Sequence, residues 1–242
     1  MKKEQDALVP VIEQLPASSN VSLDVLEQFA TGSSFLPRMQ LFTKGKYIDT
    51  GKIQPGHYGI VDGEEVIDLG ISIDVLLLGV RTKTLDMSDR DNIISRYTVG
   101  EPEFERIRQM SEVKNSSCQC GLSFLVYDSG SNTLCEFFCG SRSAQNESKK
   151  MLPFLAITPE QAVAAAEKGR IVEPKVATPL TLKVRYIQKQ FSWHVPVAIA
   201  CSAPIEVRLP TQQVLAAIEK FLNPVDEGGT VVEEDATGGR AT

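Results

Sequence analysis

Two neighbouring apolar segments near the middle of the chain decide the fold class. Leu122-Ser-Phe-Leu-Val-Tyr127 and Thr133-Leu-Cys-Glu-Phe-Phe-Cys139 are rich in aliphatic and aromatic residues, and Asp128-Ser-Gly-Ser-Asn132 separates them. Short runs of this composition on either side of a cluster of Gly, Ser, Asn and Asp are typical of two strands joined by a turn. We therefore expect an antiparallel hairpin at 122–139.

A long strand is predicted upstream of this hairpin. From Ile73 to Leu78 nearly every residue is apolar, which indicates a strand buried on both faces. After Gly79, Arg81 and Lys83 alternate with uncharged residues, so this end of the strand is expected to be bent at the glycine and basic on one face. Closer to the N-terminus, Asp62-Gly63 is a strong signal for a hairpin between short strands in the region 35–66.

The other predicted elements come from helical caps and from alternation. Pro102 is a favoured first helical position and begins a helix inside an otherwise polar insertion at 84–120. The elements expected after the hairpin are helices from Ser143 to near Pro153 and from Thr158 to Gly169, strands at Thr181–Lys189 and Phe191–Ile199, and a helix from Gln212 to Leu222.

Composition places the chain among ordinary globular proteins. Of its 242 residues, 42% are hydrophobic and 23% are charged, and 25 Lys and Arg stand against 31 Asp and Glu. This balance excludes a uniformly basic nucleic-acid binder but not a local basic surface. We expect an N-terminal helical segment at 1–34, a β domain at 35–223 and a disordered acidic tail at 224–242. No signal-peptide core or membrane span is recognised, so an intracellular, cytoplasmic location is expected.

Five cysteines, an odd number, are most simply free thiols of an intracellular protein. Cys118 and Cys120, with Cys135 and Cys139, are weak candidates for a tetrahedral zinc site. Their spacing differs from the C-x2-C pairs that most structural zinc sites use, and the second pair lies in an apolar strand where cysteine acts as a small hydrophobe. No metal and no cofactor are therefore expected.

Catalytic patterns are weak throughout the chain. Pro102-Glu103 and Glu112-Val113-Lys114 resemble a nuclease motif, but that chemistry places its E-x-K on a strand, whereas this stretch is predicted as helix and linker. The two histidines, His57 and His194, lie in no recognised nucleophile–base motif, and no glycine-rich phosphate loop is present. The protein is therefore expected not to be an enzyme.

The order of the predicted elements from Gly70 to Ala200 is β-β-β-α-β-β. This order resembles the OB-fold, a five-stranded Greek-key barrel with a helix between its third and fourth strands. The expected fold class is thus mainly β with peripheral helices (α+β), an OB-like barrel with insertions. With the acidic tail, the pattern is similar to the single-stranded DNA-binding proteins of bacteriophages. That resemblance implies sequence-tolerant binding of single-stranded DNA in replication, recombination or repair, in the host cytoplasm, with replication proteins recruited through the tail.

One predicted strand carries the residue-level support for this function. Because successive side chains alternate across a strand, Leu182, Val184 and Tyr186 are expected on the core side and basic residues on the other. Cations along phosphates, together with aromatic rings stacked on bases, are the usual means of binding single strands. The predicted phosphate-binding residues are Lys183, Arg185 and Lys189, extended by Arg81, Lys83 and Arg142, and the predicted stacking residues are Trp193 and Tyr127.

A second class of function accounts for the same residues. In a structural or protein-interaction module, such as a virion component or an adaptor, the basic residues of Thr181–Lys189 are only the solvated face of a strand. Trp193 is then a core residue, and the tail keeps the protein soluble. Charge reversal on the basic face separates the two alternatives, because an assembly module has no need of these cations.

Overall fold

The structure, a computed structural model, describes residues 36–89, 93–128, 130–155, 176–177, 180–188, 192–200, 205–206 and 211–222. The predictions for 1–34, for the helix from Thr158 to Gly169 and for the tail at 224–242 lie outside these residues. The main sheet contains β1 (Arg38–Leu41), β2 (Tyr58–Asp62), β3 (Glu65–Gly70), β4 (Ser72–Asp86), β5 (Ile94–Arg96), β6 (Cys118–Asp128), β7 (Thr133–Cys139), β9 (Leu180–Gln188) and β10 (Ser192–Ala200). Two short strands, β8 (Val176–Ala177) and β11 (Ile205–Glu206), form a separate pair. The helices are α2 (Lys46–Asp49), α3 (Pro102–Ser111), α4 (Arg142–Met151), the 3-10 turn η1 (Leu152–Phe154) and α6 (Thr211–Leu222).

The strand order of the large sheet is β10-β9-β4-β6-β7-β1-β2-β3, with β5 added to β4. Its neighbours pair antiparallel except for β1 and β7, which are parallel. Within it, β9-β4-β6-β7 has the Greek-key order 4-1-2-3, in which the fourth strand returns beside the first. The mainly β class with peripheral helices is therefore confirmed, and so is the hairpin at 122–139, which forms β6 and β7.

The closed five-stranded barrel expected from the element order is not seen. Closure of such a ring would pair β7 with β10, but the free edge of β7 is occupied by β1, which is followed by β2 and β3. Among the described strands the sheet therefore remains open, with β10 at one end and β3 at the other. The N-terminal strands enlarge the sheet because β1 supplies hydrogen bonds to an edge that would otherwise be unpaired.

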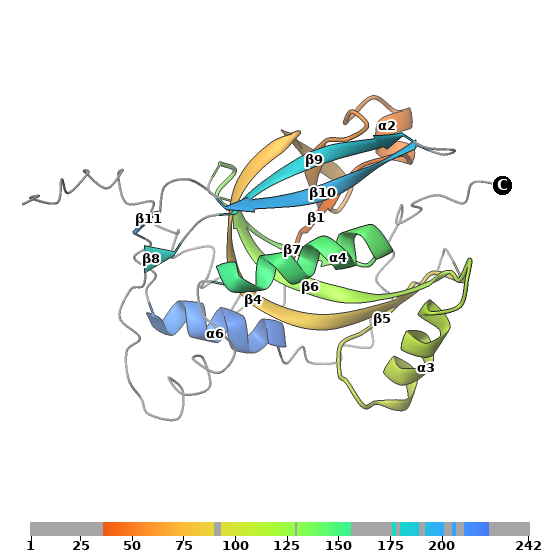
Figure 1. Cartoon of the computed structure of the whole chain (residues 1–242). Coiled ribbons are helices and arrows are strands. Elements are labelled where there is room, and N and C mark those ends of the chain that lie inside the picture. The colour runs from red at the N-terminus through yellow and green to blue at the C-terminus, as the bar shows by residue number, and fades with distance from the viewer. Residues whose placement is uncertain are drawn as a thin grey trace, which may run out of the picture.

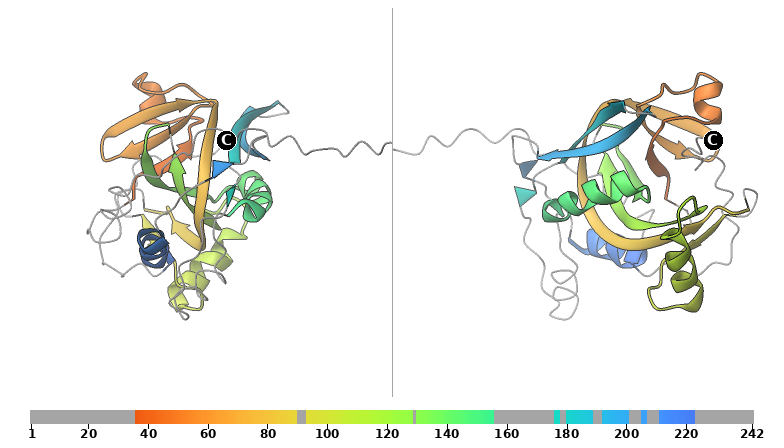
Figure 2. Two further views of the ribbon diagram at one scale, coloured as in Figure 1. Left: turned by 90° about the vertical axis from the view of Figure 1, so that its left-hand side faces the viewer. Right: turned by 45° about the vertical axis from the view of Figure 1, so that its right-hand side comes forward.

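The two faces of β4, β6 and β7 are covered by different helices (Figure 1). On the inner face, Phe124 and Val126 pack in one core cluster with Ala144 and Met151 of α4. On the outer face α6 lies against β4, and Figure 2 shows α4 and α6 on opposite sides of this strand. The alternation of side chains along β6 thus gives each helix its own apolar surface.

The predicted bend in the long strand is present. The pairing of β4 with β6 shifts register between Leu77 and Gly79, as a β-bulge does. Gly79 lies beneath α6, and a Cβ at this glycine would be in ordinary van der Waals contact with Phe221 and Ile218 of that helix. The bulge therefore marks the point at which α6 approaches the sheet.

The helix predictions that fall on described residues are close to the observed ends. Pro102 is the first residue of α3, as expected, and α6 begins one residue before Gln212. The first turn of α4 is capped by Ser141, whose hydroxyl accepts a hydrogen bond from the backbone of Ala144, and not by Ser143. None of the helices in the described ranges is long and apolar enough to cross a membrane.

Candidate nucleic-acid interface

The β9–β10 hairpin extends beyond the strand that it pairs with. β9 pairs with β4 only from Leu180 to Lys183, while its pairing with β10 continues to Gln188. We call residues 184–188 and 192–196 the arm. Tyr58 fixes the base of the arm to the N-terminal strands, because its hydroxyl donates a hydrogen bond of 3.0 Å to the carbonyl of Lys183. The arm is thus a surface element held at its base by the sheet.

One face of this hairpin is cationic. Lys183 and Arg185 lie two residues apart on β9, so they share a face, and both residues are exposed. Among the described residues no ion pair joins either of them to an acid. Directly opposite residues of an antiparallel pair share a face, and Ile187 pairs with Trp193, so the half-buried indole lies on the face that carries the two cations.

An acid and a buried side chain mark the limits of this cationic face. Exposed Asp74 of β4 accepts a hydrogen bond of 2.6 Å from the hydroxyl of Thr181 at the base of the hairpin. Val195, which pairs with Arg185, is buried. The exposed cationic surface is therefore narrow and follows β9.

On the opposite, core-facing side of β9, one residue is not buried as the alternation predicts. Leu182 is fully buried and Val184 packs against the core, as predicted. The alternation predicts Tyr186 on the core side as well, but 54% of the residue is exposed. The reason is that β4 begins at Ser72, which pairs with Lys183, so Tyr186 lies beyond the part of β9 that β4 flanks and beyond the core that would cover its ring.

Tyr186 rests on a second ring at this face. It pairs with His194 across the hairpin, and the two ring centroids are 5.1 Å apart with the planes tilted by 46°. Behind His194 lies Gly56, whose φ of +83° favours glycine. A Cβ at Gly56 would meet the imidazole at 2.8 Å, so the absence of a side chain there makes room for the histidine.

Arg81 and Lys83 are placed elsewhere, in a buried ion cluster on the outer face of β4. Glu136 of β7 accepts from Arg81 at 2.8 Å and from Lys83 at 3.0 Å, and the hydroxyl of Ser123 donates to the same carboxylate at 2.6 Å. Lys83 is only 2% exposed. The two cations therefore do not extend the exposed face of β9 in this structure.

The pKa of Glu136 in this cluster is set by burial and by the two neighbouring positive charges. Burial alone raises the pKa of Glu136, yet the adjacent charges of Lys83 and Arg81 lower it from its ordinary value to about 2. The guanidinium of Arg81 lies between two rings, 3.7 Å from the centroid of Tyr97 and 4.0 Å from that of Phe221, and it donates to the carbonyl of Phe221. Helix α6 is thus attached directly to the buried cations.

The remaining predicted site residues are not gathered on the arm. Tyr127 is 3% exposed, and its hydroxyl donates to the side chain of Asn132 at 2.6 Å, so its ring is not available for stacking in this structure. Arg142 is exposed at the first position of α4, a different element. Lys189 lies outside the described residues. Of the predicted set, the structure therefore brings together Lys183, Arg185 and Trp193.

The four weak zinc candidates are free thiols in the structure. Burial raises the pKa of Cys135 and Cys139 far above the ordinary value, and it also raises the pKa of Cys118 and Cys120. A raised pKa opposes the thiolate form that binds metals. Within the described ranges no group of three or more His, Cys, Asp or Glu is positioned to hold a metal ion.

Two of the residues considered for catalysis, Glu103 and His57, form ordinary side-chain contacts. Glu103, from the nuclease-like pattern, lies on α3 and accepts from Arg106 at 2.7 Å, so this stretch is helical as expected. His57 forms a hydrogen bond of 2.9 Å with Asp68 on the neighbouring strand β3. These contacts position side chains at the surface.

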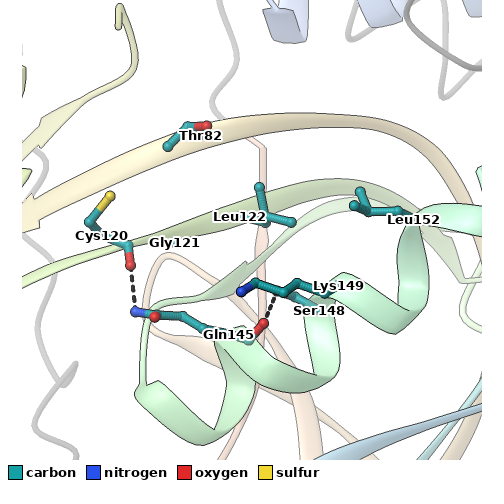
Figure 3. Close-up of a pocket in the computed structure, with 8 residues that line it drawn as sticks. All are labelled: Thr82, Cys120, Gly121, Leu122, Gln145, Ser148, Lys149 and Leu152. Atoms are coloured by element: carbon teal, nitrogen blue, oxygen red, sulfur yellow. Dashed lines mark hydrogen bonds between the residues drawn. The ribbon is translucent and has the colours of Figure 1, made fainter.

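A pocket of about 550 Å³ lies between α4 and the strands β4 and β6 (Figure 3). Leu122 and Leu152 line it with the thiol of Cys120, and Gln145 closes one side by donating to the carbonyl of Cys120 at 2.6 Å. The lining holds none of the predicted nucleic-acid-binding residues.

Comparison of the chain with models of protein families, with curated proteins and with solved structures finds no match. The candidate site therefore rests on its own geometry.

Sequence reasoning missed the Tyr186–His194 pair. A signal for it was present, because a three-residue connection from Gln188 to Ser192 sets a register in which these two residues face each other. The sequence did not show the register of β9 against β4. Alternation along β9 assigns Tyr186 to the core-facing side, but only the pairing with β4 shows that the core no longer covers β9 at this residue.

Proposed function

We propose that this protein binds single-stranded DNA without strong sequence preference and without catalysis, through the β9–β10 arm. Phosphates of the strand would lie along Lys183 and Arg185, with Trp193 on the same face. Such binding follows the general scheme of a cationic track combined with aromatic side chains.

The observation that carries the proposal is the exposed pair Lys183 and Arg185. Because a β-strand rises about 3.3 Å per residue, two cations at alternate positions are about 7 Å apart. This distance is close to the spacing of phosphates in an extended DNA single strand. Within the described ranges neither cation is paired with an acid, so both charges are available for phosphate oxygens.

The topology gives further support. If β4, β6, β7, β9 and β10 are taken as the five strands of an OB-like unit, α4 stands between the third and fourth strands, as that fold requires. The β9–β10 connection is then the loop between strands 4 and 5, one of the two loops that OB-folds use to bind oligonucleotides. The unit would be an opened OB-like sheet, with β1 to β3 added at the edge where a barrel would close.

Fluorescence anisotropy of a labelled 30-nucleotide poly-dT strand tests the proposal. Reversing the charge in the double variant Lys183→Glu/Arg185→Glu is expected to weaken binding by about tenfold or more at low salt, because phosphate neutralisation supplies most of sequence-independent affinity. The matched control is Lys114→Glu/Lys149→Glu, which changes net charge equally at two exposed positions outside the arm.

Two outcomes would contradict the proposal. The first is no binding of the poly-dT strand by the wild-type protein at low salt up to tens of micromolar. The second is an equal loss of affinity in both double variants, which would show that net charge, and not the arm, determines binding. Absence of binding would favour the structural or protein-interaction role, since an assembly module tolerates charge reversal here.

A further inference from the structure

The side chain of Tyr186 is unusual in its surroundings. It is the only aromatic ring among the exposed large hydrophobic side chains of the described residues. Tyr58 and Tyr127 are buried, as are Phe104 and Phe124. An exposed aromatic ring lacks the favourable free energy that such rings usually gain from burial. A ligand that covers the ring would provide this free energy on binding.

The ring is also held in place from behind. His194 supports one side of Tyr186 at a centroid distance of 5.1 Å, and the turn at Gly56 fills the space behind His194 so closely that a Cβ would clash. The base of the arm is anchored nearby through the hydrogen bond from Tyr58 to Lys183. An aromatic ring that is fixed before binding loses little conformational entropy when a second ring stacks on it.

We propose that Tyr186, backed by His194, is a stacking site for one unpaired base of the single strand. This inference rests on the proposed function and deepens it: it assigns base contact to a residue on the face opposite Trp193 and makes the preference for unpaired bases a property of the arm.

The position of Tyr186 next to the cations makes this contact geometrically reasonable. Tyr186 follows Arg185 directly, so their side chains leave opposite faces of β9 at the same edge. That edge is not covered by β4, whose pairing with β9 ends at Lys183. A DNA single strand that crosses this edge of β9 can therefore place a phosphate against the guanidinium of Arg185 on one face and a base against the ring of Tyr186 on the other.

The test uses substitutions at Tyr186 in the full-length chain. Tyr186→Ala is expected to weaken binding to a 30-nucleotide poly-dT strand by about 5- to 150-fold, the range found when a stacked base loses its aromatic partner. Tyr186→Phe keeps the ring and is expected to stay within about twofold of wild type. Val113→Ala removes an exposed apolar side chain after α3 and serves as the matched control, with no change expected.

A spectroscopic readout separates stacking from a general loss of folding. In the double variant Tyr186→Trp/Trp193→Phe, the only tryptophan stands at the proposed site. Its fluorescence is expected to be quenched by poly-dT and not by an abasic strand of the same length. Binding of a 30-base-pair duplex is expected to change by less than about twofold in Tyr186→Ala, because paired bases cannot stack on the ring.

The results distinguish this inference from the function on which it rests. If wild-type protein binds poly-dT but Tyr186→Ala binds equally well and the introduced tryptophan is not quenched, the stacking site is wrong while the proposed function stands. If wild-type protein does not bind poly-dT, both are wrong. A loss of affinity in Tyr186→Ala that is as large for the duplex as for the single strand also overturns the stacking site.

Discussion

Glu136 is the residue on which the outer face of the sheet most depends. Glu136 is only 6% exposed, and its carboxylate pairs with Arg81 and Lys83, which lie two residues apart on β4 and would otherwise be two like charges in a buried space. Ser123 supplies a third hydrogen bond. Removing one partner of a buried ion cluster is costly because the remaining charges are left without compensation.

Glu136→Gln is expected to destabilise the protein by about 3–5 kcal/mol, the usual result of breaking a buried ion pair. The stability should also depend on pH in a defined direction. Because the folded protein lowers the pKa of Glu136 from 4.5 to about 2, the unfolded chain binds the proton more tightly, and this contribution is lost as pH falls from about 4.5 towards 2.

Urea denaturation of both proteins at pH 7 and at pH 3 measures these effects. Wild type should lose more stability than Glu136→Gln between the two pH values, since the variant no longer takes up this proton. Glu65→Gln, at an exposed position of β3, is the control and should behave as wild type. Equal losses in wild type and Glu136→Gln would show that Glu136 does not titrate as described.

At the scale of elements, α6 covers the ion cluster with a narrow apolar stripe. Ala217, Ile218 and Phe221 are buried while Ala216 and Glu219 are exposed, as expected of an amphipathic helix on a sheet. Phe221 contacts the cluster directly, since its ring lies 4.0 Å from the guanidinium of Arg81 and its carbonyl accepts from the same group.

Phe221→Ala is therefore expected to cost about 3–5 kcal/mol, as for other buried phenylalanines replaced by alanine. The measurement is the free energy of unfolding by chemical denaturation, with exposed Glu219→Ala as the control on the same helix. A change below about 1 kcal/mol would mean that α6 contributes little to the stability of the sheet.

At the scale of the whole molecule, the open sheet leaves the arm exposed. The N-terminal strands β1 to β3 extend the sheet from β7, and the β9–β10 hairpin lies at the opposite end of the strand order. The hydrogen bond from Tyr58 to Lys183 nevertheless joins the two ends, because the sheet is strongly curved, as Figure 2 shows. Among the described strands, none pairs with β9 beyond Lys183 on the β4 side.

The salt dependence of binding reflects all the phosphates that the whole protein neutralises. Replacing both cations in Lys183→Gln/Arg185→Gln is expected to reduce the slope of log K against log salt by about 1.4, at about 0.7 per phosphate on a single strand. Anisotropy titrations with poly-dT at four salt concentrations give both slopes. An unchanged slope would place the phosphate contacts elsewhere on the molecule.

Several features could be derived from sequence because they depend on local chemistry. Four features follow from turn residues, proline geometry and the two-residue period of a strand: the hairpin at 122–139, the bend at Gly79, the helix starting at Pro102, and the placement of Lys183 and Arg185 on one face of β9. These signals lie within a few residues of one another, so no distant contact was needed to interpret them.

Other features depend on contacts between segments that are far apart in the sequence. Arg81 and Lys83 have the same alternating pattern as Lys183 and Arg185. Glu136 and α6 bury the first pair, whereas the second pair lies at and beyond Lys183, where the pairing of β9 with β4 stops. The parallel pairing of β1 with β7, which keeps the sheet open, joins segments about one hundred residues apart. The alternation of residues along a strand thus predicts which side chains share a face. Whether that face is buried depends on distant segments that pack against it.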